Sequence, residues 1–373
     1  MLPSLDEAGL SPTGIEPHRK ENPMSNRKLA FTSDYMEGAH SRILEALTAT
    51  NMEQTPGYGL DPFCESAKDR IRAACERRDA AVYFLSGGTQ TNAVVITALL
   101  KPWQGVVSAA TGHIASHEAG AIEAGGHKVL TLPEYRGKIA SSDLEALLRT
   151  YDEDANHDHM VMPGMVYISQ PTEYGTLYSL EELRSISKIC RRWQIPLYAD
   201  GARLAYALAS PENTVTLPDM ARLCDAFYIG GTKCGALLGE ALVIPNPDLL
   251  PHFFTIIKQR GALLAKGRVL GIQFDALFTD GLYDQIGKTA ITHAQRLQDA
   301  LEEAGIPLMF RSPTNQIFAV LEDEMKKTLD QYVDTSFWEK PDASHTTVRI
   351  ATSWATSQED VDALIDLLKR FKL

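Results

Sequence analysis

Residues 81–100 read AVYFLSGGTQTNAVVITALL, a short apolar run followed by a glycine turn and a helical pattern. Ala81 to Leu85 predicts a buried strand, and Thr89 to Leu100 predicts a helix. Val106 to Ala109 then predicts a second strand, and Ile114 to Ala124 a second helix. This alternation is typical of βαβ units, in which helices cover both faces of a parallel sheet.

Later short apolar runs continue the pattern and predict strands at residues 128–132, 165–169, 196–199, 226–229 and 241–244. Ser142-Asp-Leu-Glu145 and Ser179-Leu-Glu-Glu182 have the S-x-x-E spacing of a capping box, so each is expected to open a helix. We therefore predict an α/β fold, with a large domain built on a mostly parallel sheet of about seven strands.

The pattern changes after Pro245, where longer helical stretches begin. Near the end, Val361, Leu364, Ile365 and Leu368 share one face of a helix predicted over 356–371. We expect a mobile leader at 1–27, a large domain at 28–255, and a linker helix with a smaller C-terminal α+β domain at 256–373.

Composition limits the classes of function. The 373 residues are 44% hydrophobic and 23% charged, as in an ordinary globular enzyme, and the formal net charge is −12. That charge repels nucleic acids and anionic membrane surfaces, so neither is expected as a partner. No run approaches the ~20 apolar residues of a membrane span. Five cysteines without a C-x-x-C pair fit a reducing cytoplasm.

Two residues at predicted strand ends suggest chemistry. Asp200 follows the strand at 196–199, and Lys233 lies in a glycine-lined turn after the strand at 226–229. Carboxyl ends of parallel strands form the ligand crevice of open α/β sheets. A lysine amine and a carboxylate at one such edge suit pyridoxal phosphate, which needs a covalent lysine and an acid beside its ring nitrogen. Taken singly, each is more often a surface or turn residue.

Two further motifs carry weaker signals. Ser86-Gly-Gly-Thr-Gln-Thr-Asn92 joins a strand to a helix and offers backbone amides that suit a phosphate, although a plain turn is the commoner explanation. His157-Asp-His159 supplies only two imidazoles, which favours a solvated loop over a metal centre. No metal site is expected.

Together these motifs resemble the L-threonine aldolase family, pyridoxal-phosphate enzymes of the aspartate-aminotransferase-like fold. The resemblance rests on Gly88-Thr-Gln90, on the His-x4-Glu-x-Gly segment that begins at His113, on Asp200-Gly-Ala-Arg203 and on Lys233, in this order. It extends from about residue 29 to the C-terminus.

The resemblance implies roles for individual residues. Lys233 would bind the cofactor covalently, Asp200 would face its ring nitrogen, Gly88 and Thr89 would hold its phosphate, and His113 would stack on its ring. Ser33, Arg203 and Arg349 would hold the substrate carboxylate, a task that suits the planar fork of arginine. Tyr58 would reach the neighbouring subunit's site, which implies a homodimer or homotetramer.

The chain departs from the family pattern at two places. Gly261-Ala-Leu-Leu-Ala-Lys-Gly-Arg268 stands where other members carry an arginine that meets the neighbour's phosphate, so either Lys266 or Arg268 would take that role. Gln170-Pro-Thr-Glu173 stands where many members have a Thr-His pair. A carboxylate beside an apolar pocket has a raised pKa, so Glu173 is expected to act as the base or to bind the β-hydroxyl; the alternative is a turn-stabilising acid.

The resemblance implies cleavage of L-threonine- or allo-threonine-type β-hydroxy-α-amino acids to glycine and an aldehyde by a carbon–carbon lyase. The alternative with the same cofactor is a β-eliminating lyase that yields pyruvate and ammonia. A third alternative, a non-catalytic binding protein on this scaffold, is less consistent with the presence of both Lys233 and Asp200.

Overall fold

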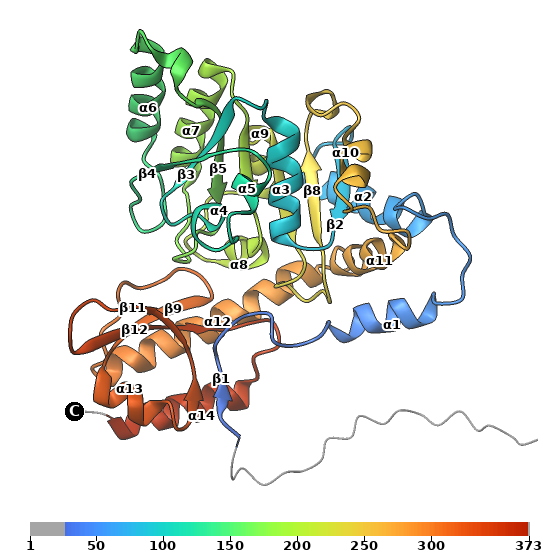
Figure 1. The fold of residues 1–373 in the computed structure, drawn as a ribbon. Coiled ribbons are helices and arrows are strands. Elements are labelled where there is room, and N and C mark those ends of the chain that lie inside the picture. Colours follow the sequence, from blue (N-terminus) through green and yellow to red (C-terminus); the bar gives the residue numbers. More distant parts are fainter. Residues whose placement is uncertain (1–26, 372–373) are drawn as a thin grey trace, which may run out of the picture.

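The computed structural model describes residues 27–371, so all of the predicted leader except Arg27 lies outside the described part. A seven-stranded sheet forms the upper part of Figure 1. All seven predicted strands are confirmed, in the sheet order β2-β8-β7-β6-β5-β3-β4. Their bounds are β2 Ala81–Leu85, β3 Gln104–Ala109, β4 Val129–Leu132, β5 Met162–Ser169, β6 Leu197–Asp200, β7 Ala226–Gly230 and β8 Glu240–Ile244.

Strand β8 is antiparallel to both of its neighbours, β2 and β7, whereas β3, β4, β5, β6 and β7 pair in parallel. The parallel strands therefore present their carboxyl ends at one edge of the sheet. Because β8 runs the other way, it brings its first residue, Glu240, to that same edge.

Helices cover both faces of this sheet, as the alternating pattern predicts. One face packs against α3 (Gly88–Leu99), α4 (His113–Ser116), α5 (Ala121–Ala124) and α10 (Phe253–Gln259). The other packs against α6 (Ser141–Glu153), α7 (Leu180–Trp193), α8 (Leu204–Ala209) and α9 (Leu217–Leu223). Side chains alternate between the two cores along each strand, for example Tyr198 and Ala199 in β6.

The two expected capping boxes have different outcomes. Ser179 and Glu182 form the predicted box at the start of α7, with distances of 3.2 Å and 2.7 Å between side-chain oxygen and backbone nitrogen. The box at Ser142 is wrong, because α6 begins one residue earlier, after Ala140, and no side chain caps it. Glu145 instead accepts hydrogen bonds from arginine side chains.

The single helix expected at 114–124 is also wrong. Ala119 and Gly120 have φ angles of 51° and 71°, in the left-handed region, and they lie between α4, which ends at Ser116, and α5, which begins at Ala121. A right-handed helix cannot pass through two such residues. The buried Glu118 lies between the two short helices and is therefore placed differently than in a single straight helix. It belongs to the site described below.

The helices at 41–49 and 62–74 also pack on the core of the large sheet, whereas the C-terminal residues form the helices that lead to a smaller α+β domain (Figure 1). Its antiparallel sheet has the order β11-β12-β9 and packs with α12 and α14 around a separate core. The short strand β1 pairs in parallel with β10, so an N-terminal segment is joined to the C-terminal part of the chain here. Where the two domains divide stays a prediction.

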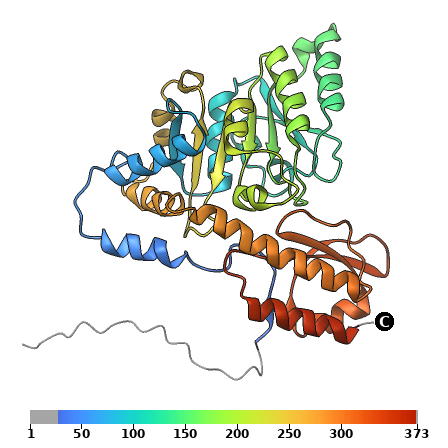
Figure 2. The same cartoon turned by 180° about the vertical axis from the view of Figure 1, so that it is seen from behind.

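The bounds of these elements are β1 Leu29–Ala30, α1 Ser41–Ala49, α2 Pro62–Ala74, α11 Arg268–Leu277, α12 Leu282–Glu303, β9 Gln316–Glu322, α13 Asp323–Leu329, β10 Val333–Asp334, β11 Ser336–Glu339, β12 His345–Ala351 and α14 Gln358–Leu368. Three short 3-10 helices span His157–His159, Pro247–Leu249 and Lys369–Phe371. Figure 2 shows α12 running below the large sheet toward the C-terminal sheet. Within residues 27–371, no helix is both long and apolar enough to cross a bilayer.

Helices α2 and α11 approach closely at Gly271, and this contact generates a test of the packing. A Cβ at Gly271 would lie 2.4 Å from Cys64 Sγ and 2.7 Å from Cys64 Cα. Because one of these atoms is backbone, we expect Gly271→Ala to push the helices apart at a cost of ~1–3 kcal/mol, against about 1 kcal/mol gained in helix propensity.

Thermal unfolding would measure this cost, and Gly38→Ala is the matched control. A Cβ at Gly38 would meet only Leu237 Cδ2, at 4.0 Å. A Gly271→Ala protein that melts at or above the wild-type temperature would contradict the close approach of α2 and α11.

Candidate active site

A cavity of about 300 Å³ lies at the edge of the large sheet where the parallel strands end. It is bounded by the residues that follow β5, β6 and β7, by the start of β8 and by the first turn of α3. Most of the predicted site residues line it together: Gly88, Thr89, His113, Glu173, Asp200, Arg203 and Lys233. The remaining four, Ser33, Tyr58, Lys266 and Arg349, are not part of its lining.

Asp200, the last residue of β6, holds a buried carboxylate with four donors. Oδ1 accepts hydrogen bonds from the Tyr228 hydroxyl (2.5 Å) and the Ala202 amide (3.0 Å), and Oδ2 from the Tyr167 hydroxyl (2.7 Å) and Asn92 (3.1 Å). Burial raises the pKa of Asp200, but the Tyr228 hydrogen bond and the charge of His113 lead the opposing effects, and the net pKa is lowered. Asp200 is therefore a fixed negative charge.

Lys233 follows β7 after Gly231 and Thr232. Among the described residues, none lies within hydrogen-bond distance of its Nζ, while the backbone oxygen of Lys233 accepts a hydrogen bond from Tyr206. Burial and the positive charge of Arg203 lower the pKa of Lys233, although Asp34 and Asp200 oppose them. The turn is thus held in place while the amine is left available and easier to deprotonate, as a nucleophilic lysine requires.

The first turn of α3 offers backbone donors to the same cavity. Gly87 caps this helix without a side-chain hydrogen bond, so the amide groups of the first turn keep no side-chain acceptor. Gln90 turns back and accepts hydrogen bonds from the Ser86 amide and hydroxyl, which fixes the loop. This is an arrangement that favours an anion.

His113 is oriented by Glu118 through a hydrogen bond of 2.8 Å between Nδ1 and Oε1. The same Oε1 accepts a hydrogen bond from Asn92 at 2.7 Å, and Asn92 also reaches Asp200. Glu118 Oε2 is buried without a hydrogen-bond partner among the described residues. A carboxylate on Nδ1 holds the imidazole ring at a fixed angle and favours a proton on that nitrogen.

Glu173 lies after β5, where the sequence predicts it. Its Oε1 accepts hydrogen bonds from the His113 amide at 2.8 Å and the Ser169 hydroxyl at 2.7 Å. Burial raises the pKa of Glu173, and the Ser169 hydrogen bond opposes this only in part. Both expected properties are therefore present: a carboxylate that stabilises the local turn, and one with a raised pKa in the cavity wall.

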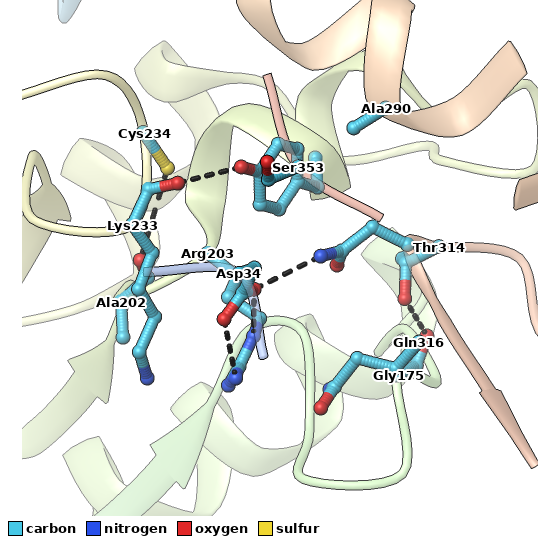
Figure 3. Close-up of polar contacts among 12 residues, drawn as sticks. Asp34, Gly175, Ala202, Arg203, Lys233, Cys234, Ala290, Thr314, Gln316 and Ser353 are labelled. Carbon is cyan, nitrogen blue, oxygen red and sulfur yellow. Dashed lines mark hydrogen bonds and ion pairs between the residues drawn. The ribbon is translucent and has the colours of Figure 1, made fainter. Parts of the chain in front are cut away.

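Arg203 forms a buried ion pair with Asp34 (Figure 3). Its Nε and Nη2 donate to the two oxygens of Asp34 at 2.6 Å and 3.0 Å, and Asn315 donates to Asp34 at 2.9 Å. Burial raises the pKa of Asp34, but the charges of Arg203 and Lys233 bring it down to about 2. One side of the Arg203 fork is thus already engaged, which leaves Nη1.

Arg349, on β12, lies outside the lining but is linked to it. Its Nη1 donates to Gln316 at 3.2 Å, and Gln316 in turn donates to the backbone oxygen of Glu173 at 3.3 Å. Arg349 also donates to the backbone oxygen of Thr32, next to the buried Ser33. Its buried Nε lacks a hydrogen-bond partner among the described residues.

Tyr58 and Lys266 lie elsewhere. Tyr58 is 41% exposed and lines a second, largely apolar cavity of about 250 Å³ between α10, β2 and the start of α11. Lys266 is exposed nearby. Arg268, in contrast, stacks on Phe63 and donates to the backbone oxygens of Thr50 and Glu53 in its own chain.

Sequence reasoning missed Asp34, Tyr228 and Glu240, all buried polar residues of the site. Glu240 left one signal, a carboxylate directly ahead of the apolar run 241–244. Asp34 and Tyr228 left none of this kind, because their partners are distant in the sequence.

Comparison with known proteins agrees with this geometry. A family model described as beta-eliminating lyase matches residues 30–324. The chain is 30% identical over 310 residues to a low specificity L-threonine aldolase from a Pseudomonas species, covering 82% of this chain and 88% of that protein. It is 26% identical over 300 residues to a low-specificity L-threonine aldolase of Candida albicans, covering 76% and 74%.

Solved structures give the same result. A Leishmania major threonine aldolase superposes with a TM-score of 0.89 at 44% identity, over 92% of this chain and 99% of that one. Aspartate aminotransferase from Thermus thermophilus, at 13% identity and a TM-score of 0.67 over 92% and 91% of the two chains, shares the fold alone. With a family match over most of its length and these relatives, the chain belongs to the L-threonine aldolase family of beta-eliminating-lyase-type proteins.

Proposed function

We propose that this protein is a pyridoxal-phosphate-dependent aldolase that cleaves L-threonine- or allo-threonine-type β-hydroxy-α-amino acids to glycine and an aldehyde. One observation carries the proposal. The cavity holds both the amine of Lys233, which forms no hydrogen bond within residues 27–371, and the fixed carboxylate of Asp200. When bound, the cofactor supplies an electron sink for the electrons of the breaking Cα–Cβ bond. Relatives described as threonine aldolases favour this cleavage over β-elimination.

The residues of the cavity fit this cofactor. The amides at the start of α3, with Gly88 and Thr89, would hold the phosphate, and Lys233 would hold the aldehyde carbon. Asp200 would face the ring nitrogen, where its negative charge keeps the nitrogen protonated. Four donors already occupy its two oxygens, so the ring nitrogen would replace one of them, and Tyr228 and Ala202 are donors that also line the cavity. His113 would lie against the ring.

Recognition of the substrate carboxylate falls to cationic groups around Arg203. Nε and Nη2 of Arg203 donate to Asp34, whereas Nη1 does not. We assign Ser33 and Arg349 to the same task, and no residue from 27 to 371 forms a hydrogen bond with Arg349 Nε. Charged hydrogen bonds of this kind each contribute about 1.5–3 kcal/mol.

Glu173 is our candidate for the base that removes the β-hydroxyl proton, directly or through a water. Its raised pKa makes it a better proton acceptor at neutral pH than an exposed carboxylate. The hydrogen bonds from His113 and Ser169 occupy Oε1 and hold the side chain in one orientation. Oε2 is then the oxygen that takes and returns the proton.

We further propose that two copies of this chain complete each site, in a homodimer or homotetramer in the cytoplasm. Arg268 is engaged within its own chain, whereas Lys266 is exposed and forms no ion pair with any residue from 27 to 371. This favours Lys266 as the cation that meets the neighbour's phosphate. Tyr58, exposed beside it, would reach the same site.

Lys233→Ala is the direct test of the cofactor assignment. The purified wild-type protein should be yellow, and borohydride should fix the cofactor to a peptide that contains Lys233. The variant should lose this covalent label and keep its circular dichroism spectrum. Labelling of a different lysine would refute the assignment, and pyruvate in place of aldehyde and glycine would establish the β-eliminating alternative.

Asp200→Asn should bind the cofactor but lose most of its activity. A neutral amide cannot keep the ring nitrogen protonated, so the ring accepts electrons poorly. Aldehyde release, followed by a coupled dehydrogenase, measures the loss, with the cofactor content determined in parallel. If turnover stays close to that of the wild type, Asp200 does not have this role.

Glu173→Gln should lower kcat by ~10²–10⁴, the usual contribution of a general base, with cofactor content unchanged. Because the pKa of Glu173 is raised and the base must be ionised, wild-type kcat should rise with pH through that pKa, and the rise should vanish in the variant. A fall of less than about threefold would leave Glu173 as a turn-stabilising acid.

A further inference from the structure

Glu240 is a buried carboxylate that the proposed reaction does not use. It is 3% exposed and lines the same cavity as Lys233 and Asp200. It pairs across the sheet with Leu85 of β2 and with Gly230 of β7. Glu240 therefore stands between the start of the Ser86 loop and the start of the turn that carries Lys233.

The carboxylate is attached to that lysine turn. Oε2 accepts a hydrogen bond from the Gly231 amide at 3.1 Å. The Thr232 hydroxyl also accepts a hydrogen bond from the Gly239 amide at 2.9 Å, directly before Glu240. Two of the residues leading to Lys233 are thus fixed by Glu240 and its neighbour.

We propose that Glu240 is a positioning residue for Lys233, whose carboxylate holds the lysine turn and, through its charge, sets the protonation state of the lysine nitrogen. This inference rests on the proposed function, because Lys233 must be the lysine that binds the cofactor. The carboxylate and the amine face one cavity without a direct ion pair in the described residues, so their charges act on each other across it.

The electrostatics of the cavity support this role. Burial raises the pKa of Glu240 to about 8, and hydrogen bonds and the charge of Lys233 oppose the rise. Burial lowers the pKa of Lys233, and Glu240 is one of the charges that oppose the fall. Each group therefore acts on the protonation of the other: an ionised Glu240 favours the protonated amine of Lys233, and a protonated Lys233 favours the ionised carboxylate.

Other ionisable groups also face the pair, and each is unchanged in the experiment below. Asp200 from β6 and Lys233 act on Glu240, while Arg203, Asp34 and Asp200 act on Lys233. The phenols and the thiol around the pair have pKa values raised by burial and stay neutral: Tyr198, Tyr228, Tyr283 and Cys234. Among these groups, the experiment changes only the carboxylate of Glu240.

Glu240→Gln keeps the shape and an oxygen acceptor for the Gly231 amide but removes the charge. The readout is the visible absorbance of the full-length protein loaded with pyridoxal phosphate, titrated with pH, which reports protonation of the nitrogen that joins Lys233 to the cofactor. Loss of a nearby negative charge disfavours the protonated nitrogen, so the midpoint should fall by roughly one pH unit. Glu240→Asp keeps the negative charge, so its midpoint should stay close to that of the wild type.

Asp225→Asn is the matched control, because Asp225 precedes β7 at the opposite edge, accepts a backbone hydrogen bond from Leu197, and has a pKa raised by burial. It should leave the midpoint unchanged. Glu240→Ala removes the same charge if the glutamine variant does not fold.

The inference fails if the neutral Glu240 variants have the same titration midpoint as the wild type. It also fails if Asp225→Asn shifts the midpoint by the same amount as they do. Borohydride labelling separates this failure from that of the proposed function: a label on Lys233 with an unchanged midpoint overturns only the role of Glu240. A label on another lysine overturns both.

Discussion

The buried contact among Asp34, Arg203 and Asn315 joins three separate parts of the chain. Asp34 comes from the N-terminal segment and Arg203 from the turn after β6 (Figure 3). Asn315 directly precedes β9 of the C-terminal sheet. Asp34 is fully buried, so removing either Asp34 or Arg203 would leave the other charge buried and uncompensated, at a cost of about 3–5 kcal/mol. The site therefore depends on the packing of the C-terminal part against the large sheet.

The same contact constrains the chemistry of Arg203. An arginine near a substrate carboxylate has to be held in one orientation before the substrate arrives, or the substrate must supply the ordering free energy. Asp34 provides this orientation with two parallel hydrogen bonds. Burial and the charge of Arg203 lower the pKa of Lys233, and the charge of Asp34 opposes them, so the ion pair that orients the arginine also limits how far the pKa of the amine falls.

Much of the fold and part of the site could be predicted because they depend on local pattern. Each of the seven strands contains a short apolar run, Asp200 is the last residue of β6, and Lys233 lies three residues after the end of β7. Ser179 caps α7 through hydrogen bonds with Glu182, three positions along the chain. The sequence pattern failed where the backbone conformation is not encoded in hydrophobic periodicity, as at Ala119, whose φ of 51° interrupts the expected helix.

The other residues of the site could not be predicted because their meaning comes from topology. Tyr228 is apolar enough to pass for a strand core residue, and only the pairing of β7 with β6 brings its hydroxyl to Asp200. Glu240 reads as the polar residue before a strand. It reaches the cavity because β8 is antiparallel, a direction that no pattern within the strand reveals.

The charge balance of the cavity connects these features. Carboxylates of Asp34, Glu118, Glu173, Asp200 and Glu240 surround it, against the cations Arg203 and Lys233 and the imidazole of His113. Asp34 and Asp200 stay ionised because several donors hold them, whereas burial raises the pKa values of Glu173 and Glu240. Since a phosphate would add further negative charge, the carboxylates with few donors are those that can accept a proton and keep the site near neutrality.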